Sequence, residues 1–400
     1  MELKLGYKQT EVGVIPEDWK IQCLGDVAHI VGGGAFKSKD VQKVGVRWLK
    51  IANVGINEIL WKEEAFLPEE FSRMHSQFLL NPDDYVIALT RPILNSFLKI
   101  AKISQNDAPS LLNQRVGKIE GVNNHDPSFL YYVFQKESTV YALQQSMAGT
   151  DPPNLSTKSV YSIQCAIPSN KTEQEAITGA LSDADALIES LEQLIAKKRQ
   201  IKQGAMQELL TGNKRLPGFN GAWGVSTFGD IFNITAGGDV DIKETISYQD
   251  QTHCYPVYSN TVTGSGLYGY CTYSDHQACS ITVSARGTLG FAIFRDHAFT
   301  AIGRVIVLHP KREIDGRFIA EVINHQITFA IESTGVPQLT APQISNYSIP
   351  VPSFTEQTAI VCILSDMDAE INELEVKLEK VRQIKQGMMQ NLLTGKIRLV

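Results

Sequence analysis

Two stretches of this chain place apolar residues at a regular spacing of 3.5 residues. In the first stretch Leu181, Ile188 and Ile195 occupy one seam position, while Ile177, Ala184 and Leu191 occupy the other. The second stretch repeats the pattern with Ile360, Leu364, Met367, Ile371, Leu374, Leu378, Val381 and Met388. Apolar residues sustained at this spacing over several heptads predict a coiled coil.

The two stretches are copies of each other. Residues 172–216 and 355–399, offset by 183, agree at about 28 of 45 positions. Thr172 and Glu175 suggest a capping box, and Gly212 and Gly395 stand where helices end. A helix of about 38 residues would be about 57 Å long and would leave its apolar seam exposed. We therefore expect the two copies to pair with each other as an antiparallel intramolecular coiled coil.

The blocks before each copy read as short strands broken by turn residues. VRWLKIANV (46–54), DYVIALT (84–90) and ITVSARGTLGFAIF (281–294) are typical of strands. The segments 129–146 and 316–331 are typical of helices. The fold class expected for each block is α+β with mostly antiparallel strands.

The two blocks also resemble each other at their turns. Trp19 aligns with Trp223, and the strand VIALTRP aligns with SITVSARG, which places Arg91 opposite Arg286. Each block closes in a Pro-containing loop, AGTDPPNLS or TGVPQLT. We predict four parts, namely a globular domain over 1–168, a helical spacer over 169–216, a second globular domain over 217–352 and a second spacer over 353–400. The globular domains would share a fold but not a surface.

Composition is that of a water-soluble protein. The chain of 400 residues has 43% hydrophobic and 20% charged residues, which suits two to three domains. No apolar run approaches the roughly 20 residues needed to span a bilayer, and the start lacks a signal-peptide pattern. The six cysteines are scattered without a CxxC pair, as is typical of reduced thiols. These features predict a cytoplasmic protein.

The charge argues mildly against a protein that binds nucleic acid on its own. The net charge is −6, and neither block is basic: residues 1–165 carry 17 basic and 18 acidic side chains, and residues 217–350 carry 7 and 11. Affinity for nucleic acid depends mainly on neutralising phosphates.

Motifs for cofactor or metal chemistry are weak. DPPN (151–154) lacks the terminal aromatic residue of amino methyltransferases, and GGGAFKS (32–38) departs from a phosphate-binding loop at Phe36. His253, Cys254, His276 and Cys279 match no structural zinc spacing. We therefore expect no cofactor and no metal.

Several polar residues could read base edges or contact phosphates. The loop 258–270 mixes Tyr, Ser, Asn, Thr and Gly, which suits either a recognition surface or an ordinary hairpin with a glycine-rich tip. The candidates for contact with DNA are Lys37, Lys39, Arg47, Lys50, Asn53, Arg91, Tyr258, Ser259, Asn260 and Arg286.

The order of these features resembles the specificity subunit of type I restriction–modification systems. The resemblance covers nearly the whole chain and is carried by TEQEAI and TEQTAI at the helix starts and by RQIKQG-x-MQ-x-LLTG in both copies. IPEDWK, GAWGV and SLLNQRVGKI also match the family's pattern. Net acidity is the departure from a simple DNA-binding profile.

The resemblance implies a non-catalytic subunit. Each globular domain would be a target recognition domain that reads one half of a bipartite site in double-stranded DNA. The helices would fix the gap between the halves and dock two modification (methyltransferase) subunits, which restriction subunits would join. Residues implied in the coiled coil and in docking are Ile177, Leu181, Ile188, Leu191, Ile195, Ile360, Leu364, Ile371, Leu374, Leu378 and Val381. The alternatives are a methyltransferase with fused recognition domains and a coiled-coil scaffold that does not bind DNA.

Overall fold

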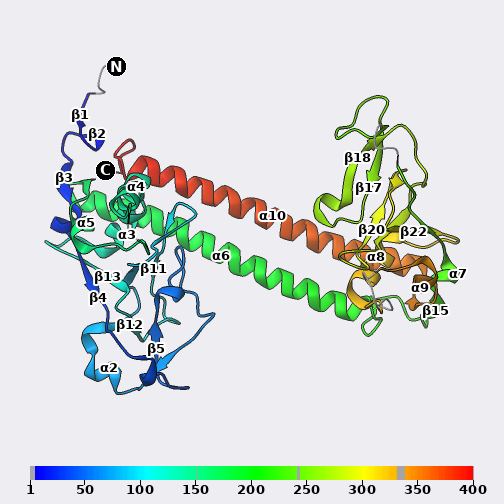
Figure 1. Ribbon diagram of the computed structural model, residues 1–400, viewed down its shortest axis with the longest axis horizontal. Coiled ribbons are helices and arrows are strands. Elements are labelled where there is room, and N and C mark those ends of the chain that lie inside the picture. The colour runs from blue at the N-terminus through cyan, green and yellow to red at the C-terminus, as the bar shows by residue number, and fades with distance from the viewer. Residues whose placement is uncertain (1–4, 150, 241–243, 331–337, 400) are drawn as a thin grey trace. The chain divides into compact units, whose positions relative to one another are not determined.

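The computed structural model describes residues 5–149, 151–240, 244–330 and 338–399. The chain divides into two compact units (Figure 1): unit 1 comprises Met1–Ser190 and Lys377–Val400, and unit 2 comprises Leu191–Val376. Each unit therefore combines one globular block with the beginning of one long helix and the end of the other. In the described part of the chain, no helix is long and apolar enough to cross a membrane.

Unit 1 contains two four-stranded sheets. In the first, of order β11-β8-β13-β4, all neighbours are antiparallel; in the second, of order β6-β5-β12-β7, β12 runs parallel to β5. The strands are β1 (Tyr7–Thr10), β2 (Gly13–Pro16), β3 (Lys20–Cys23), β4 (Ala28–Gly32), β5 (Val46–Leu49), β6 (Phe66–Leu67), β7 (Leu79–Leu80), β8 (Tyr85–Ala88), β9 (Ile93–Leu94), β10 (Phe97–Leu98), β11 (Ile100–Lys102), β12 (Ser110–Leu112), β13 (Val116–Gly121) and β14 (Gln164–Ile167). The short helices are α1 (Leu24–Val27), α2 (Phe71–Met74), α3 (Pro127–Gln135), α4 (Glu137–Ser146) and α5 (Thr157–Tyr161).

Unit 2 repeats this arrangement with fewer strands. Its sheets have the orders β16-β22-β19-β20 and β18-β17-β21, and β21 runs parallel to β17. The strands are β15 (Gly224–Thr227), β16 (Phe232–Ala236), β17 (Tyr255–Tyr258), β18 (Leu267–Cys271), β19 (Ser280–Ser284), β20 (Ala292–Arg295), β21 (Thr300–Ala301), β22 (Val305–Pro310) and β23 (Ser348–Val351). The short helices are α7 (Phe228–Ile231), α8 (Gly316–Gln326) and α9 (Ala341–Ser345).

The two units share one topology, which confirms the prediction of a repeated α+β fold. Strands β4, β13, β8 and β11 correspond in order to β16, β22, β19 and β20, and the parallel pair β5–β12 corresponds to β17–β21. In each unit one helix packs against the first sheet, α3 in unit 1 and α8 in unit 2. Both begin at an aspartate whose carboxylate accepts a backbone N–H, Asp126 and Asp315. The cores differ in their residues, as expected of copies that diverged.

The long helices α6 (Lys171–Leu209) and α10 (Phe354–Leu392) have 39 residues each. They pair antiparallel within each unit. In unit 1 the Lys385 Nζ lies 2.5 Å from a carboxylate oxygen of Asp185, and in unit 2 the equivalent Lys202 lies 2.5 Å from Asp368. Ion pairs at equivalent positions of the repeat are what an antiparallel pairing of two copies produces, so the coiled-coil prediction is confirmed.

The predicted seam faces inward. Nine of its side chains are buried, and five are partly buried (Ile188, Met367, Leu374, Val381 and Met388). The buried members are Ile177, Leu181, Ala184, Leu191, Ile195, Ile360, Leu364, Ile371 and Leu378. A partner subunit would therefore meet other residues of these helices.

The helix starts and ends differ from the prediction in one respect. Gly212 and Gly395 end their helices with φ of 73° and 71°, the left-handed region that glycine adopts easily. The capping box of Thr172 and Glu175 is wrong. Instead, the side chain of Asn170 accepts the Thr172 N–H at 2.9 Å, because α6 starts earlier than predicted, at Lys171.

Four predicted elements are shorter than the sequence suggested. The helix predicted over 129–146 is broken at Lys136 into α3 and α4. The backbone of Lys136, with φ of −58° and ψ of 133°, is not helical. The helix predicted to end at residue 331 ends at Gln326, and residue 331 lies outside the described residues. The long strand over 281–294 is a hairpin of β19 and β20, because Gly287 and Gly290 adopt positive φ between them. The segment 46–54 is a strand only to Leu49, and a turn of 3-10 helix (Ile51–Asn53) follows.

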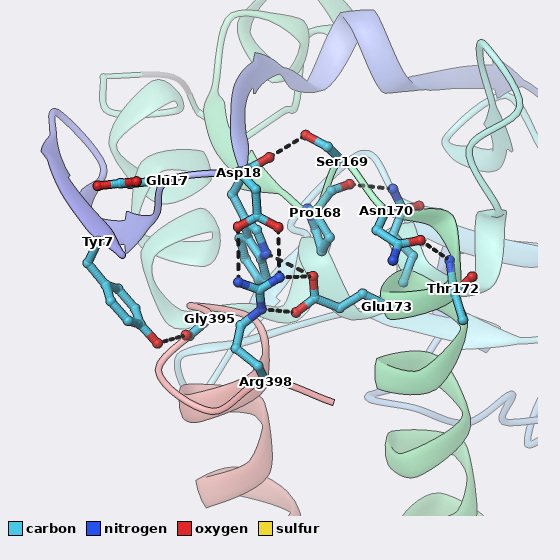
Figure 2. Close-up of polar contacts among 12 residues, drawn as sticks. Tyr7, Glu17, Asp18, Pro168, Ser169, Asn170, Thr172, Glu173, Gly395 and Arg398 are labelled. Carbon is cyan, nitrogen blue, oxygen red and sulfur yellow. Dashed lines mark hydrogen bonds and ion pairs between the residues drawn. The ribbon is translucent and has the colours of Figure 1, made fainter. Parts of the chain in front are cut away.

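A buried glutamate at the start of each long helix ties the globular block to the helices. In unit 1 the carboxylate of Glu173 accepts from the Trp19 indole at 3.1 Å and from Arg398 Nη2 at 2.8 Å. Figure 2 shows that the Arg398 guanidinium also bonds Asp18, at 2.8 and 3.0 Å, and that the Tyr7 hydroxyl donates to the Gly395 carbonyl. These carboxylates hold the pKa of Arg398 above its usual value.

Unit 2 repeats the same cluster. Glu356 accepts two hydrogen bonds of 2.6 Å from Arg215 and one of 3.2 Å from the Trp223 indole. Arg215 follows the end of α6, and Arg398 follows the end of α10. The glutamate of each TEQ segment and the arginine of each Arg-Leu pair after a helix end (Arg215 and Arg398) therefore join the start of each long helix to the end of the other copy. This contact explains why both short segments recur in the sequence.

Candidate functional site

In unit 1 the loops that follow β4 and β8 and the loop that precedes β13 lie at one end of the first sheet, and in unit 2 the loops that follow β16 and β19 and the loop that precedes β22 do so. We call these two regions, with the segments bonded to them, the loop ends. Backbone hydrogen bonds set the correspondence between them. The Gly33 N–H donates to the Val116 carbonyl at 3.3 Å in unit 1, and the Gly237 N–H donates to Val305 at 2.7 Å in unit 2. Added side chains would clash at both glycines, since a Cβ would lie 2.2 Å and 2.5 Å from the nearest carbonyl oxygen. A glycine at each of these two positions thus permits close packing of the backbone.

A second pair of bonds locates arginines at equivalent places. The Leu89 N–H donates to the Arg115 carbonyl, and the Ala285 N–H donates to the Arg304 carbonyl, both at 2.9 Å. Arg115 and Arg304 are exposed, and within the described residues neither side chain has an ion pair. The sequence reasoning missed them as a pair. The signal was present, because each is followed by the first valine of an inner strand, as QRV in one block and GRV in the other.

These bonds also correct the alignment of Arg91 with Arg286. Because Leu89 corresponds to Ala285, Thr90 corresponds to Arg286 and Arg91 corresponds to Gly287. Arg91 and Gly287 share a positive φ, 46° and 77°. The sequence alignment, which matched one arginine with the other, was therefore wrong by one residue. Both arginines still lie at the loop ends.

The loop end of unit 1 brings together segments distant in sequence. The Arg91 N–H donates to the Pro153 carbonyl at 2.7 Å, and Thr90 forms a bridge with Asn154. The DPPN segment is therefore a loop beside Arg91, as expected for a segment that closes the domain. Lys37 and Lys39 are exposed on the segment that follows Gly34. Phe36, in contrast, packs edge-on against Trp48 and Phe78, so the GGGAFKS segment is anchored by its aromatic residue.

Two of the candidates around β5 have structural roles. Asn53 is 1% exposed, and its side-chain amide donates to the carbonyls of Leu60 and Glu63. It is not available to a base edge. The Arg47 guanidinium donates to the Asn106 carbonyl at 2.5 Å and pairs with Glu64 at 3.1 Å. Arg47 is partly buried and both terminal nitrogens of its guanidinium are engaged, so its contacts are better explained as a link between loops.

Lys50 keeps a partly exposed position. Its ammonium lies 4.7 Å from the centre of the Trp48 ring. The adjacent Leu49 carbonyl accepts the Asn113 N–H at 3.1 Å, which puts the end of β5 beside the turn that carries Arg115. Lys50 is therefore the one of the three β5 candidates that stays available at the loop end.

The loop end of unit 2 contains the predicted polar hairpin. Strands β17 and β18 are joined by a tip in which the Ser259 N–H donates to the Gly266 carbonyl at 2.8 Å. The Asn260 side-chain amide donates to the Arg286 carbonyl at 2.9 Å. The structure thus brings Ser259, Asn260 and Arg286 together, and all three side chains are partly exposed.

Tyr258 is instead part of the support. Its side chain is 7% exposed, its hydroxyl is 2.8 Å from His297 Nε2, and burial raises its pKa. The guanidinium of Arg295 lies 3.5 Å from the ring centre and donates to the Ser265 carbonyl at 2.7 Å. Arg295 is 5% exposed, and burial lowers its pKa. This stacked pair holds the tip of the hairpin, a role for which Arg295 gave no signal in the sequence.

The histidines and cysteines of unit 2 are not arranged around a common point. His276 Nδ1 lies 3.1 Å from His309 Nε2, and His309 Nδ1 lies 2.9 Å from the Ser280 hydroxyl. Burial lowers the pKa of both histidines. His253 contacts Asp250 instead. Across the described ranges, no group of three or more His, Cys, Asp or Glu side chains could hold a metal ion.

The outer faces of the long helices carry a second repeated feature. Ile201 and Ile384 are the isoleucines of the two RQIKQG copies, and they are 48% and 51% exposed. In unit 2, Leu194 lies one heptad before Ile201 on α6 and is 38% exposed. The same exposed apolar position thus occurs once in each copy, outside the seam.

Comparison with known proteins agrees with this architecture. The family described as "Type I restriction modification DNA specificity domain" matches residues 16–201 and 220–383. The MjaVIII specificity subunit of Methanocaldococcus jannaschii is 35% identical over 215 residues, which are 54% of this chain and 50% of that protein. The MjaX subunit, a putative specificity subunit of the same organism, is 22% identical over 98% of this chain and 97% of its own length. The chain thus spans half of the first relative and nearly all of the second.

The fold recurs in a solved structure. The S subunit of a type I restriction–modification system from M. genitalium superposes with a TM-score of 0.63 at 17% identity, covering 98% of each chain. The family match extends over both globular blocks and most of the long helices, which are the parts that the internal repeat relates. The chain therefore belongs to the family of type I restriction–modification DNA specificity domains.

Proposed function

We propose that this protein is the DNA sequence-specificity subunit of a type I restriction–modification complex. Unit 1 and unit 2 would each read one half of a bipartite site in double-stranded DNA through their loop ends. The subunit itself would catalyse no reaction and would need no cofactor. It would direct adenine methylation and restriction in the cytoplasm by positioning its partners on the chosen sequence.

One observation carries this proposal. The two units share sheet order and glutamate clusters, yet their loop ends share an exposed arginine, Arg115 or Arg304, and little else. Exposed arginines can contact phosphates or guanine edges, and the divergent residues around them can distinguish bases. A common scaffold with two different loop ends is suited to reading two different half-sites.

The acidic composition is compatible with this role. Acidic side chains are drawn into the helix pairing and the clusters at the helix starts, as Asp185, Asp368, Glu173 and Glu356 illustrate. Each of these carboxylates is paired with a lysine or an arginine, so these ion pairs leave the net charge of −6 unchanged. Modification subunits would supply further positive charge around the duplex.

We infer that the division into recognition domains over 1–168 and 217–352 and helical spacers over 169–216 and 353–400 reflects this function. The spacers would set the gap between the half-sites. Exchange of one globular domain should change one half-site, whereas insertion of a heptad in both helices should change the gap alone. Restriction subunits would join the complex after the modification subunits.

Two modification subunits would dock on the two copies of the exposed isoleucine. Ile201 and Ile384 are similarly exposed and occupy the same position of the repeat, which favours two equivalent docking sites. Ile201→Asp or Ile384→Asp should each reduce the stoichiometry from two modification subunits to one in native mass spectrometry. The double variant should bind neither. Retention of both subunits by the double variant would refute this docking surface.

Methylome sequencing tests the function as a whole. A host that expresses this subunit with its partners should acquire one bipartite motif with methylated adenines. A host with the modification subunits alone should not. Binding of S-adenosylmethionine by the purified subunit would favour the alternative of a fused methyltransferase, and the absence of any new motif would favour a scaffold that does not bind DNA.

A further inference from the structure

An apolar hairpin projects from the loop end of unit 1. Strands β9 and β10 pair antiparallel, with Phe97 opposite Leu94, and Asn95 and Ser96 form the turn with φ of 50° and 67°. Two consecutive residues with positive φ make the tight turn that matches the twist of a hairpin. Leu94 and Phe97 stand beside the turn and are 52% and 58% exposed. The hairpin thus presents a leucine and a phenylalanine at its tip.

The base of this hairpin is fixed to the domain. Leu98 is 3% exposed and belongs to the main core of unit 1. The Lys99 N–H donates to the Pro92 carbonyl at 2.6 Å, and the Lys99 ammonium donates to the Ile51 carbonyl at 2.9 Å. The hairpin is therefore anchored at its base by the buried side chain of Leu98 and by the two hydrogen bonds of Lys99. Its exposure is a property of the folded domain.

The hairpin occurs in only one of the two units. It lies in the connection between β8 and β11, which runs from Leu89 to Lys99. The corresponding connection of unit 2, between β19 and β20, runs only from Ala285 to Phe291 and forms a glycine turn. The extra residues are an insertion at the loop end, where a recognition domain would differ from its copy.

Basic side chains flank the hairpin. Arg91 stands at the start of the connection, and Arg115 is joined to it through the bond from the Leu89 N–H to the Arg115 carbonyl. Both arginines are exposed and, in the described part of unit 1, neither forms a side-chain ion pair. Proteins that bend DNA use arginines to contact phosphates while an apolar side chain enters the base stack. A surface that combines free guanidinium groups with a rigid apolar tip suits this mode of binding.

We propose that Leu94 and Phe97 insert as a wedge between two base pairs of the half-site that unit 1 reads. This inference rests on the proposed function. Insertion unstacks one step and bends the duplex, so the sequence at that step is selected by how easily it deforms. Pyrimidine–purine steps should be preferred there, because they unstack most easily. Unit 2 lacks the hairpin and would read its half-site without such a wedge.

The wedge can be tested with the complete complex and the duplex identified by methylome sequencing. Each adenine of either half-site is replaced in turn by 2-aminopurine, whose fluorescence rises when it is unstacked. With the wild-type protein, a rise of several-fold is expected at one step in the half-site of unit 1, apart from the adenine that a modification subunit flips out of the stack to methylate. The double variant Leu94→Ser/Phe97→Ser should lose this rise and bind the duplex about 10- to 100-fold more weakly, as expected for loss of stacking contacts.

Two variants control for fold and for loss of apolar surface. Phe97→Leu keeps an apolar wedge and should retain most of the fluorescence change. Met74→Ser removes an apolar side chain that is 66% exposed elsewhere in unit 1 and should behave as wild type. Unchanged fluorescence and affinity in the double variant would overturn the wedge.

The remaining outcomes separate the wedge from the proposed function. If the wild-type complex selects no duplex, the proposed function itself fails. If it selects one but no 2-aminopurine position in the unit 1 half-site other than the methylated adenine responds, the wedge fails and the function stands. If the double variant loses a modification subunit in native mass spectrometry, the hairpin is a protein contact and the wedge is overturned.

Discussion

The cluster at Glu173 should be one of the most sensitive points of unit 1. Substitution of Arg398 by methionine keeps the length of the side chain and removes its charge. Glu173 is 0% exposed and would keep only the Trp19 indole as a donor among its present partners. Breaking a buried ion pair by removing one partner costs about 3–5 kcal/mol, because the remaining charge is left without compensation. Arg398 itself retains 26% side-chain exposure, so water can partly replace it, and we expect the lower end of this range, about 3 kcal/mol.

Hydrogen exchange measured by mass spectrometry can assign this loss to one unit. A loss of about 3 kcal/mol corresponds to exchange more than about 100-fold faster in the core strands of unit 1, since each 1.4 kcal/mol is tenfold. Peptides from the core of unit 2 should be unaffected. Arg215→Met supplies the matched control, because it removes the partner of Glu356 and should accelerate exchange in unit 2 instead.

A double substitution checks the cause. Glu173→Gln removes the charge that Arg398 compensates, while the amide oxygen can still accept from Trp19. Arg398→Met combined with Glu173→Gln should therefore be more stable than Arg398→Met alone. If Arg398→Met changes exchange in unit 1 by less than about threefold, or if the double variant is the less stable, the reasoning about a buried uncompensated carboxylate is wrong.

Three further predictions concern the seam, the pH dependence and the loop ends. Leu191→Asp places a charge at a buried seam position and should destabilise unit 2 by more than about 3 kcal/mol in urea unfolding, whereas Leu194→Asp, three residues further and 38% exposed, should change stability little. Burial lowers the pKa of His276 and His309 in the folded state, so the unfolded chain takes up the protons first as the pH falls. The contribution of these histidines to stability should therefore be fully present above about pH 6.5 and decrease below it. His309→Gln should reduce this pH dependence in urea titrations between about pH 7.5 and about pH 5. Arg286→Ala and Arg304→Ala should each weaken specific DNA binding by the assembled complex about 10-fold or more, with unchanged assembly in native mass spectrometry; normal methylation by both would show that these arginines do not contact DNA.

The plan of this protein could be read from its amino-acid sequence alone. A repeat of 45 residues with apolar positions every 3.5 residues has few ways to bury its seam, and pairing of the two copies is the direct one. The terminal glycines of the helices were equally readable, because a left-handed residue after a helix strongly favours glycine. The correspondence of the two blocks was visible in Trp19 and Trp223, whose indoles both bond the glutamate at a helix start.

Which polar residues are available for recognition depends instead on how the chain packs in three dimensions. Asn53 and Tyr258 looked like recognition residues, yet their neighbours in space bury them and take up their hydrogen-bonding groups. Arg115 and Arg304 are an equivalent pair only because β-sheet hydrogen bonds place them so, across hairpins of unequal length. Periodicity is a local property that the sequence carries directly, whereas the exposure of a side chain depends on what the folded chain brings next to it.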